Sequence, residues 1–204
     1  MHLQAADFSS MDAFFRRHFF NTLPGPRSVH LLGTKGHRGT ENLGVFSSVV
    51  HLGASPPHLG FVLRPLTVPR HSYHHLLAQG YFTLNTIHSD ILPAAHQSSA
   101  NYAYETSEFA AVGLTPEYSA AVPAPYVKES RIKLGLRFVE EHYIKANNTR
   151  FIVGEVVELF VPDQFVSDEG YVDHNQLGTL AVTGLEQYHQ VEQVAHYPYA
   201  RVKQ

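Results

Sequence analysis

The sequence predicts a mainly β protein, a β-barrel decorated by short helices. Residues 59–63 and 132–138 place large apolar side chains on alternate positions, which is the period of a half-buried strand. Residues 150–161 continue this pattern over a longer strand that Gly154 interrupts, so we expect a bulge there. The helical patterns between the strands are short and do not alternate as βαβ units would, which favours a barrel over a parallel sheet.

Length and composition fit one domain. The chain has 204 residues, and we assign a helical segment to residues 1–26, the barrel to 28–188 and a tail to 189–204. The net charge of −3 gives no reason to expect nucleic acid as a partner. The absence of cysteine excludes disulfides, thiolate catalysis and cysteine-ligated metals. No apolar run of about 18 residues and no signal-peptide pattern occurs, so we expect a cytoplasmic protein that does not enter a membrane.

The N-terminal segment predicts one amphipathic helix over residues 11–23, capped by Ser9 or Ser10. A stripe of phenylalanines at helical spacing indicates a core or subunit contact. Further along the chain, the local patterns predict a strand at 28–34, a strand at 81–87, a helix at 89–99, and a helix at 108–112 that Ser107 caps and Gly113 ends.

Residues 42–64 organise the rest of the chain. A small-residue loop at Asn42-Leu43-Gly44 leads into a strand-like run with two hydroxyls, Ser47 and Ser48. A turn at residues 53–57 and a second strand ending at Arg64 follow. This order brings hydroxyls, free backbone amides and a guanidinium close together, which suits a phosphorylated aromatic ligand. The alternative is a β-hairpin with serines on its solvated face and an arginine at its end.

A second candidate feature lies at residues 70–79. Ser72 predicts an N-cap for a short helix over 73–79, closed by Gly80. A helix N-terminus offers unpaired amides and a partial positive charge, so it binds phosphate readily. Arg70, His71 and Ser72 lie where such a phosphate would bind. The alternative is a capped helix beside a solvated arginine.

Other kinds of site have weak support. The chain has 15 histidines, but His74 and His75 are adjacent on a predicted helix and point about 100° apart, and there is no HExxH pattern, so we expect no metal site. No G-x-S-x-G, Walker or G-x-G-x-x-G motif occurs, which disfavours a serine hydrolase and a Rossmann-type nucleotide site. The carboxylate pairs Glu140-Glu141 and Asp168-Glu169 fit solvated turns or strand ends.

Taken together, several short motifs resemble one family. The order of Asn42-Leu43-Gly44-Val45-Phe46-Ser47-Ser48, Pro56-Pro57, Arg64-Pro65 and Arg70-His71-Ser72 is similar to that of the flavin reductase-like, FMN-binding split-barrel family, in its flavoredoxin-like branch. Further matches are Ser99-Ala100, Ser107-Glu108-Phe109 with Gly113-Leu114-Thr115, Val127-Lys128-Glu129-Ser130 and Gly154-Glu155-Val156. The resemblance runs from about Ser28 to Tyr188, which is most of the chain.

The resemblance implies a six-stranded Greek-key split barrel that forms a homodimer, with FMN near the subunit interface. By position, the residues that would line the isoalloxazine are Asn42, Leu43, Gly44, Phe46, Ser47, Ser48 and Val49. The residues that would hold the phosphate are Arg64, Arg70, His71 and Ser72. Relatives often have Lys-Asp-Thr before this helix, so this chain keeps the hydroxyl and lacks the acidic residue. Ser99 also falls at a cofactor-binding position, and Tyr188 and His189 fall where relatives approach the nicotinamide.

The function implied is an FMN-dependent NAD(P)H:flavin oxidoreductase that transfers hydride from the nicotinamide to flavin N5. The cofactor carries this chemistry, so no catalytic acid or base is required. The reduced flavin could serve a partner monooxygenase or another acceptor. Two alternatives stay open: an FMN-binding electron carrier that does not oxidise NAD(P)H directly, and a protein of the same fold with another ligand such as haem.

Overall fold

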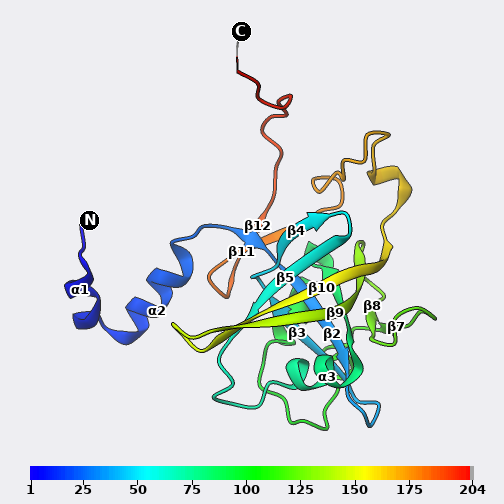
Figure 1. Cartoon of the computed structure of the whole chain (residues 1–204), viewed down its shortest axis with the longest axis horizontal. Helices are drawn as coiled ribbons and strands as arrows, with labels where there is room; N and C mark the ends of the chain where they lie inside the picture. Colours follow the sequence, from blue (N-terminus) through cyan, green and yellow to red (C-terminus); the bar gives the residue numbers. More distant parts are fainter. Residues whose placement is uncertain (203–204) are drawn as a thin grey trace.

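The computed structural model describes residues 1–202 and shows a mainly β molecule, as predicted (Figure 1). The main sheet has seven antiparallel strands in the order β3-β2-β6-β9-β10-β5-β4. Its strands are β2 (His30–Lys35), β3 (Glu41–Phe46), β4 (Val50–Ala54), β5 (Pro57–Leu63), β6 (Tyr81–Thr86), β9 (Lys133–Ile144) and β10 (Thr149–Phe160).

The sheet curls so that its two edge strands, β3 and β4, approach each other. These strands lie at opposite ends of the strand order, yet only residues 47–49 separate them in the chain. Four peptide steps from Phe46 to Val50 span at most roughly 14 Å. The two edges must therefore lie close together without pairing, which is the geometry of a split barrel.

Two predictions for this stretch are wrong: Asn42-Leu43-Gly44 lies within strand β3 and not in a loop, and Ser47 and Ser48 lie between β3 and β4 and not within a strand. The hydroxyl of Ser48 donates to the carbonyl of Val62 at 3.0 Å and accepts from the Val62 amide at 3.1 Å. A side chain thus replaces a backbone partner, and the strand ends at Phe46. The main sheet has seven strands instead of six because this stretch contributes both β3 and β4.

The long hairpin of β9 and β10 confirms the predicted bulge. Its register shifts between Val153 and Gly154. A Cβ atom at Gly154 would lie 2.6 Å from the ring of Phe82, so only glycine fits where the strand bends over the core. The strand β9 extends well beyond the predicted residue 138, to Ile144.

Two apolar clusters form the core. One fills the barrel and includes Phe61, Phe82 and Leu136. The other includes Leu43 and Phe109 and lies between β3 and the short helices that follow β6. These elements are η1 (Ser89–Ile91), α4 (Leu92–Gln97) and α5 (Glu108–Val112). The remaining strands are β1 (Arg27–Ser28), β11 (Leu180–Thr183) and β12 (Gln187–Gln190) in one small sheet, and β7 (Pro116–Glu117) with β8 (Tyr126–Val127) in another; η2 is Asp163–Phe165.

The N-terminal segment forms two helices where one was predicted: α1 (Ala5–Ser10) and α2 (Ala13–Thr22). The chain breaks at Asp12 because its carboxylate accepts hydrogen bonds from the amides of Phe14 and Phe15, both at 3.0 Å, and so begins a new helix. Neither helix contains a buried residue, and Phe14 is 67% exposed. The phenylalanines are therefore not part of the core, and α1 and α2 form an arm that extends from the barrel (Figure 1).

Candidate functional site

The predicted site lies along the free edge of β3. Strand β3 pairs only with β2, so every second backbone amide of β3 points away from the sheet. The amide of Leu43 is one of these, and it donates to the Glu108 carboxylate at 3.1 Å. Val45 lies two residues further along, so its amide points the same way. This edge therefore offers a backbone donor to a planar ligand.

Glu108 is buried beside this edge, and no ion pair neutralises it among residues 1–202. Burial raises the pKa of its carboxyl, while the amides of Glu108 itself and of Leu43 act in the opposite direction. Sequence reasoning gave Glu108 no role, because its contact with β3 joins residues 65 positions apart.

Asn42 links β3 to the start of α3 (His71–Gln79). Its side chain is 5% exposed, and its amide donates to the hydroxyl of Ser72 at 2.9 Å and to that of Thr34 at 3.2 Å. Gly44 faces the same place, since a Cβ atom there would lie 3.7 Å from the Ser72 hydroxyl oxygen. Three residues predicted for one site, Asn42, Gly44 and Ser72, thus lie together.

The start of α3 has unpaired amides but not the predicted cap. The helix begins at His71 with Arg70 as its N-cap residue, and no side chain caps it. Ser72 does not cap the helix because it lies within the first turn, where its hydroxyl accepts from Asn42. The amides of Tyr73 and His74 donate to the Arg70 carbonyl. Those of His71 and Ser72 have no hydrogen-bond partner in the part of the chain that is described.

Arg64 and Arg70 lie near this helix start, and neither has a carboxylate partner within residues 1–202. The Nε atom of Arg70 is buried without a partner. Arg64 is an exposed residue, but packing around its guanidinium lowers its pKa, and the charges of Arg70 and then Arg17 lower it further. Uncompensated cations beside free amides make this region suitable for an anion.

His71 and His75 pack against Tyr104, which folds over α3 from the loop before α5. The ring centroids of His71 and Tyr104 are 4.8 Å apart, and His75 Nε2 lies 3.3 Å from the Tyr104 hydroxyl. Burial lowers the pKa of His71, and the neighbouring His74 adds to this. His71 is therefore a neutral imidazole near neutral pH, able to donate or accept one hydrogen bond.

The residues at the end of β3 and directly after it have different roles. The Phe46 ring packs edge-to-face on Phe61 at 5.1 Å and forms part of the barrel wall, and Val49 packs on the same cluster. The Ser48 hydroxyl is hydrogen-bonded to the backbone carbonyl and amide of Val62. The hydroxyl of Ser47 has no hydrogen-bond partner among the described residues, so of the two it is the one available to a ligand.

The other predicted residues form a separate group around α4. His96 Nδ1 lies 3.0 Å from the Tyr188 hydroxyl, and the Ser99 hydroxyl donates to the His96 carbonyl at 2.7 Å. Tyr188 packs on the same cluster as Val45, so this group flanks the other end of the β3 edge. His189 Nε2 lies 2.8 Å from the Thr183 hydroxyl within the small sheet, and no hydrogen bond joins its side chain to α3 or β3 among the described residues.

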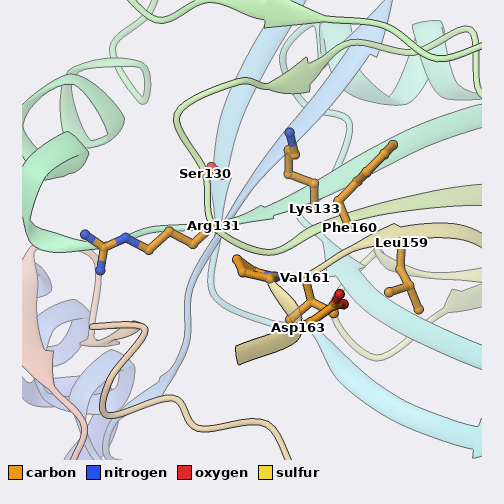
Figure 2. Close-up of a pocket in the computed structure, with 8 residues that line it drawn as sticks. Ser130, Arg131, Lys133, Leu159, Phe160, Val161 and Asp163 are labelled. Carbon is orange, nitrogen blue, oxygen red and sulfur yellow. The ribbon is translucent and has the colours of Figure 1, made fainter. Parts of the chain in front are cut away.

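A hollow of the surface lies elsewhere, at the start of β9 and the end of β10. It measures about 540 Å³, and its lining residues are Ser130, Arg131, Lys133, Leu159, Phe160, Val161, Pro162 and Asp163 (Figure 2). Arg131 and Lys133 extend in different directions there and are already engaged by Asp90 and Glu117. The unpaired cations and free amides lie at α3 and β3, so we place the candidate site there and not in this hollow.

Two further kinds of site find no support in the described residues. No group of three or more His, Cys, Asp or Glu side chains could hold a metal ion within residues 1–202. No helix in this part of the chain is long and apolar enough to cross a membrane.

Comparison with known families decides the identity. The model of the flavin reductase like domain matches residues 25–179. The chain belongs to the flavin reductase-like family. This confirms the resemblance inferred from the order of motifs between Asn42 and Ser72, and it makes the fold a split barrel of an oxidoreductase family.

Solved structures agree with the fold. A protein of Shewanella frigidimarina assigned as a flavin reductase with a split barrel domain is 40% identical; the match covers 98% of this chain and 100% of that one, with a TM-score of 0.94. Nitrilotriacetate monooxygenase component B from Bacillus cereus is 16% identical over 97% of this chain and 98% of its own, with a TM-score of 0.85. Flavoredoxin of Desulfovibrio vulgaris is 23% identical over 86% and 92%, with a TM-score of 0.72. The last two similarities establish the fold alone.

Proposed function

We propose that this protein is an FMN-dependent NAD(P)H:flavin oxidoreductase. The observation that carries the proposal is the junction of β3 and α3, where Asn42 and Ser72 are joined and two arginines lack carboxylate partners. Family membership and the 40% identical flavin reductase structure support it further.

The residues present fit the phosphate of FMN. A phosphate monoester carries close to two negative charges near pH 7 and accepts several hydrogen bonds. The free amides of His71 and Ser72 and the guanidinium groups of Arg64 and Arg70 would neutralise and orient it. The Ser72 hydroxyl accepts from Asn42, so its own proton stays free to donate to the phosphate.

The ring of the flavin would lie along the edge of β3. The Val45 amide and the Ser47 hydroxyl would donate hydrogen bonds there, and the missing side chain at Gly44 leaves room beside Ser72. Donors at this edge would stabilise negative charge on the ring. Leu43 cannot donate to the ligand, because Glu108 holds its amide. Ser48 is likewise engaged within the barrel, so Ser47 would provide the hydroxyl of this pair.

Bound FMN would supply the redox chemistry by accepting a hydride from NAD(P)H at N5. The chain's own residues would bind and orient the two reactants, so no general acid or base is needed. Tyr188, held by His96 at the other end of the β3 edge, is the residue we propose to contact the nicotinamide. His189 is included in this proposal only because it follows Tyr188 in the sequence.

An electron carrier is the second candidate. Flavoredoxin shares the fold, and a chain that binds FMN at β3 and α3 without admitting NAD(P)H would act in this way. The likeness to component B of a monooxygenase suggests, within the proposal, that an oxygenase receives the reduced flavin. A cytoplasmic location and a homodimer remain predictions from the sequence.

An anaerobic titration tests the proposal. FMN is added to the purified protein, its absorption near 450 nm is recorded, and NADH or NADPH is then added without oxygen. Bleaching by either nucleotide supports the reductase and identifies its donor. Bound flavin that stays oxidised favours the electron carrier. Failure to bind FMN contradicts both, and a Soret band in the purified protein would reveal a haem ligand instead.

A further inference from the structure

A cluster of three side chains joins α3 to the β9–β10 hairpin. The Tyr73 hydroxyl donates to one oxygen of the Glu141 carboxylate at 2.8 Å, and the other oxygen accepts from the Arg150 guanidinium at 3.4 Å. The guanidinium carbon of Arg150 also lies 5.4 Å from the centroid of the Tyr73 ring. Each of the three side chains therefore contacts the other two. Glu141 is thus engaged by two partners, whereas the sequence indicated a solvated charge.

The cluster is largely shielded from solvent. Tyr73 is 8% exposed and packs in the core cluster that also contains Leu63. Burial raises the pKa of the Tyr73 hydroxyl, and the hydrogen bond to Glu141 adds to the rise, so the hydroxyl is protonated and donates near neutral pH. The side chains of Glu141 and Arg150 are 30% and 24% exposed, so salt screens their contact less than it would screen an open surface pair.

The cluster connects the two parts of the proposed phosphate site. Tyr73 is the third residue of α3 and directly follows Ser72, whose backbone amide has no partner among the described residues. Leu63 is the register partner of Arg150, and Arg64 is the next residue after Leu63. The contacts therefore fix the first turn of α3 relative to the strand end that carries Arg64.

We propose that Tyr73 and Glu141 are positioning residues, which hold the first turn of α3 in place for the flavin phosphate, with Arg150 as their link to the end of β5. This inference rests on the proposed flavin site. Donors to a phosphate act well only when other contacts fix their geometry, because a small displacement weakens several hydrogen bonds at once. Neither residue needs to touch the phosphate, since each acts through the helix start.

The test compares FMN with riboflavin, which has the same ring and no phosphate. Dissociation constants for both are measured by fluorescence quenching. Tyr73→Phe keeps the buried ring and removes only the hydroxyl that Glu141 accepts. This variant is expected to weaken FMN binding roughly tenfold, the size of one hydrogen bond to a charged group, and to leave riboflavin binding unchanged.

Tyr143→Phe is the matched control. The Tyr143 ring also lies beside the Arg150 guanidinium, at 5.3 Å, but its hydroxyl donates to Asn148 in the hairpin turn. Removing this hydroxyl should change neither dissociation constant. A second comparison uses Glu141→Leu, which has no acceptor for Tyr73. In that background Tyr73→Phe should weaken FMN binding no further, because the two residues act through one hydrogen bond.

Three results overturn the inference. If Tyr73→Phe keeps the wild-type preference for FMN over riboflavin, Tyr73 does not position the phosphate site. If it weakens both flavins equally, its role is purely structural. If the losses from Tyr73→Phe and Glu141→Leu simply add, the two residues do not act together.

Arg70→Ala separates this inference from the proposed function. Loss of the FMN preference in Arg70→Ala but not in Tyr73→Phe rejects the positioning role and leaves the phosphate site standing. A wild-type protein with no preference for FMN rejects the phosphate site itself, and the positioning role with it.

Discussion

Ser47 and Ser48 are adjacent in the sequence, but of the two hydroxyl groups only that of Ser48 forms hydrogen bonds within residues 1–202. The Ser48 hydroxyl accepts a hydrogen bond from the Val62 amide at 3.1 Å and donates one to the Val62 carbonyl at 3.0 Å. These bonds fix the segment between β3 and β4 to strand β5. Ser47 has no such partner within residues 1–202. The sequence shows two adjacent serines and cannot show which one the barrel uses, because Val62 lies 14 positions away.

Ser48→Ala is therefore expected to destabilise the fold. The substitution leaves a partly buried amide and carbonyl without partners, which typically costs about 1–3 kcal/mol of unfolding free energy. Ser47→Ala is the matched control and should change stability by less than about 0.5 kcal/mol while weakening FMN binding. Urea unfolding of both variants measures the difference, and equal stabilities would contradict the division of roles.

At the level of elements, the position and the C-terminal end of α3 were predicted correctly, but its N-cap was not. Gly80 ends the helix in the left-handed conformation, as expected from the glycine after the helical pattern. The cap at Ser72 is wrong because Asn42, from a distant strand, takes the hydroxyl. Local patterns thus located the helix, whereas a tertiary contact decided the role of its second residue. The break between β3 and β4 escaped prediction for the same reason.

The packing of α3 makes stability depend on pH through His75. Burial lowers the pKa of His75 to about 4 from its ordinary 6.5, and the neighbouring His71, His74 and His37 add to the shift. The unfolded chain takes up a proton at the ordinary value. The stability that neutral His75 contributes is therefore complete above pH 6.5 and is lost as the pH falls toward 4.

Melting temperatures between pH 7 and pH 4 test this dependence. His75→Gln should melt with a shallower fall over that range than the wild type. The exposed His74→Gln should follow the wild type. Part of the fall should remain in His75→Gln, because burial also lowers the pKa of His30 to about 4. Identical curves for all three proteins would show that His75 is not protected from protonation in the folded protein.

For the whole molecule, the alternation of the strands predicted a β-barrel, and the order of the motifs, through the resemblance they carry, implied a split barrel. The arm was not, because the phenylalanine stripe of α2 has the spacing of a core helix although Phe14 is 67% exposed. Val157 and Leu159 on β10 add exposed apolar surface to the barrel. The homodimer that the resemblance implies is a prediction, and we expect its interface to cover such exposed apolar surface.

Light scattering of the eluting protein should give twice the monomer mass. Leu159→Lys places a charge on the exposed apolar surface of β10 and is expected to shift the mass toward the monomer. Val194→Lys, on the exposed tail, is the control and should leave the dimer intact. A wild-type protein that is monomeric at every concentration would contradict the expected homodimer.

We propose that one flavin phosphate binds where β3 meets α3. A crystal structure of the protein soaked with FMN tests it most directly. We expect the phosphate within hydrogen-bond distance of Ser72 and Arg70 and the ring along β3 near Val45. FMN bound in the hollow beside Lys133, or anywhere remote from Asn42 and Ser72, would contradict this placement of the phosphate.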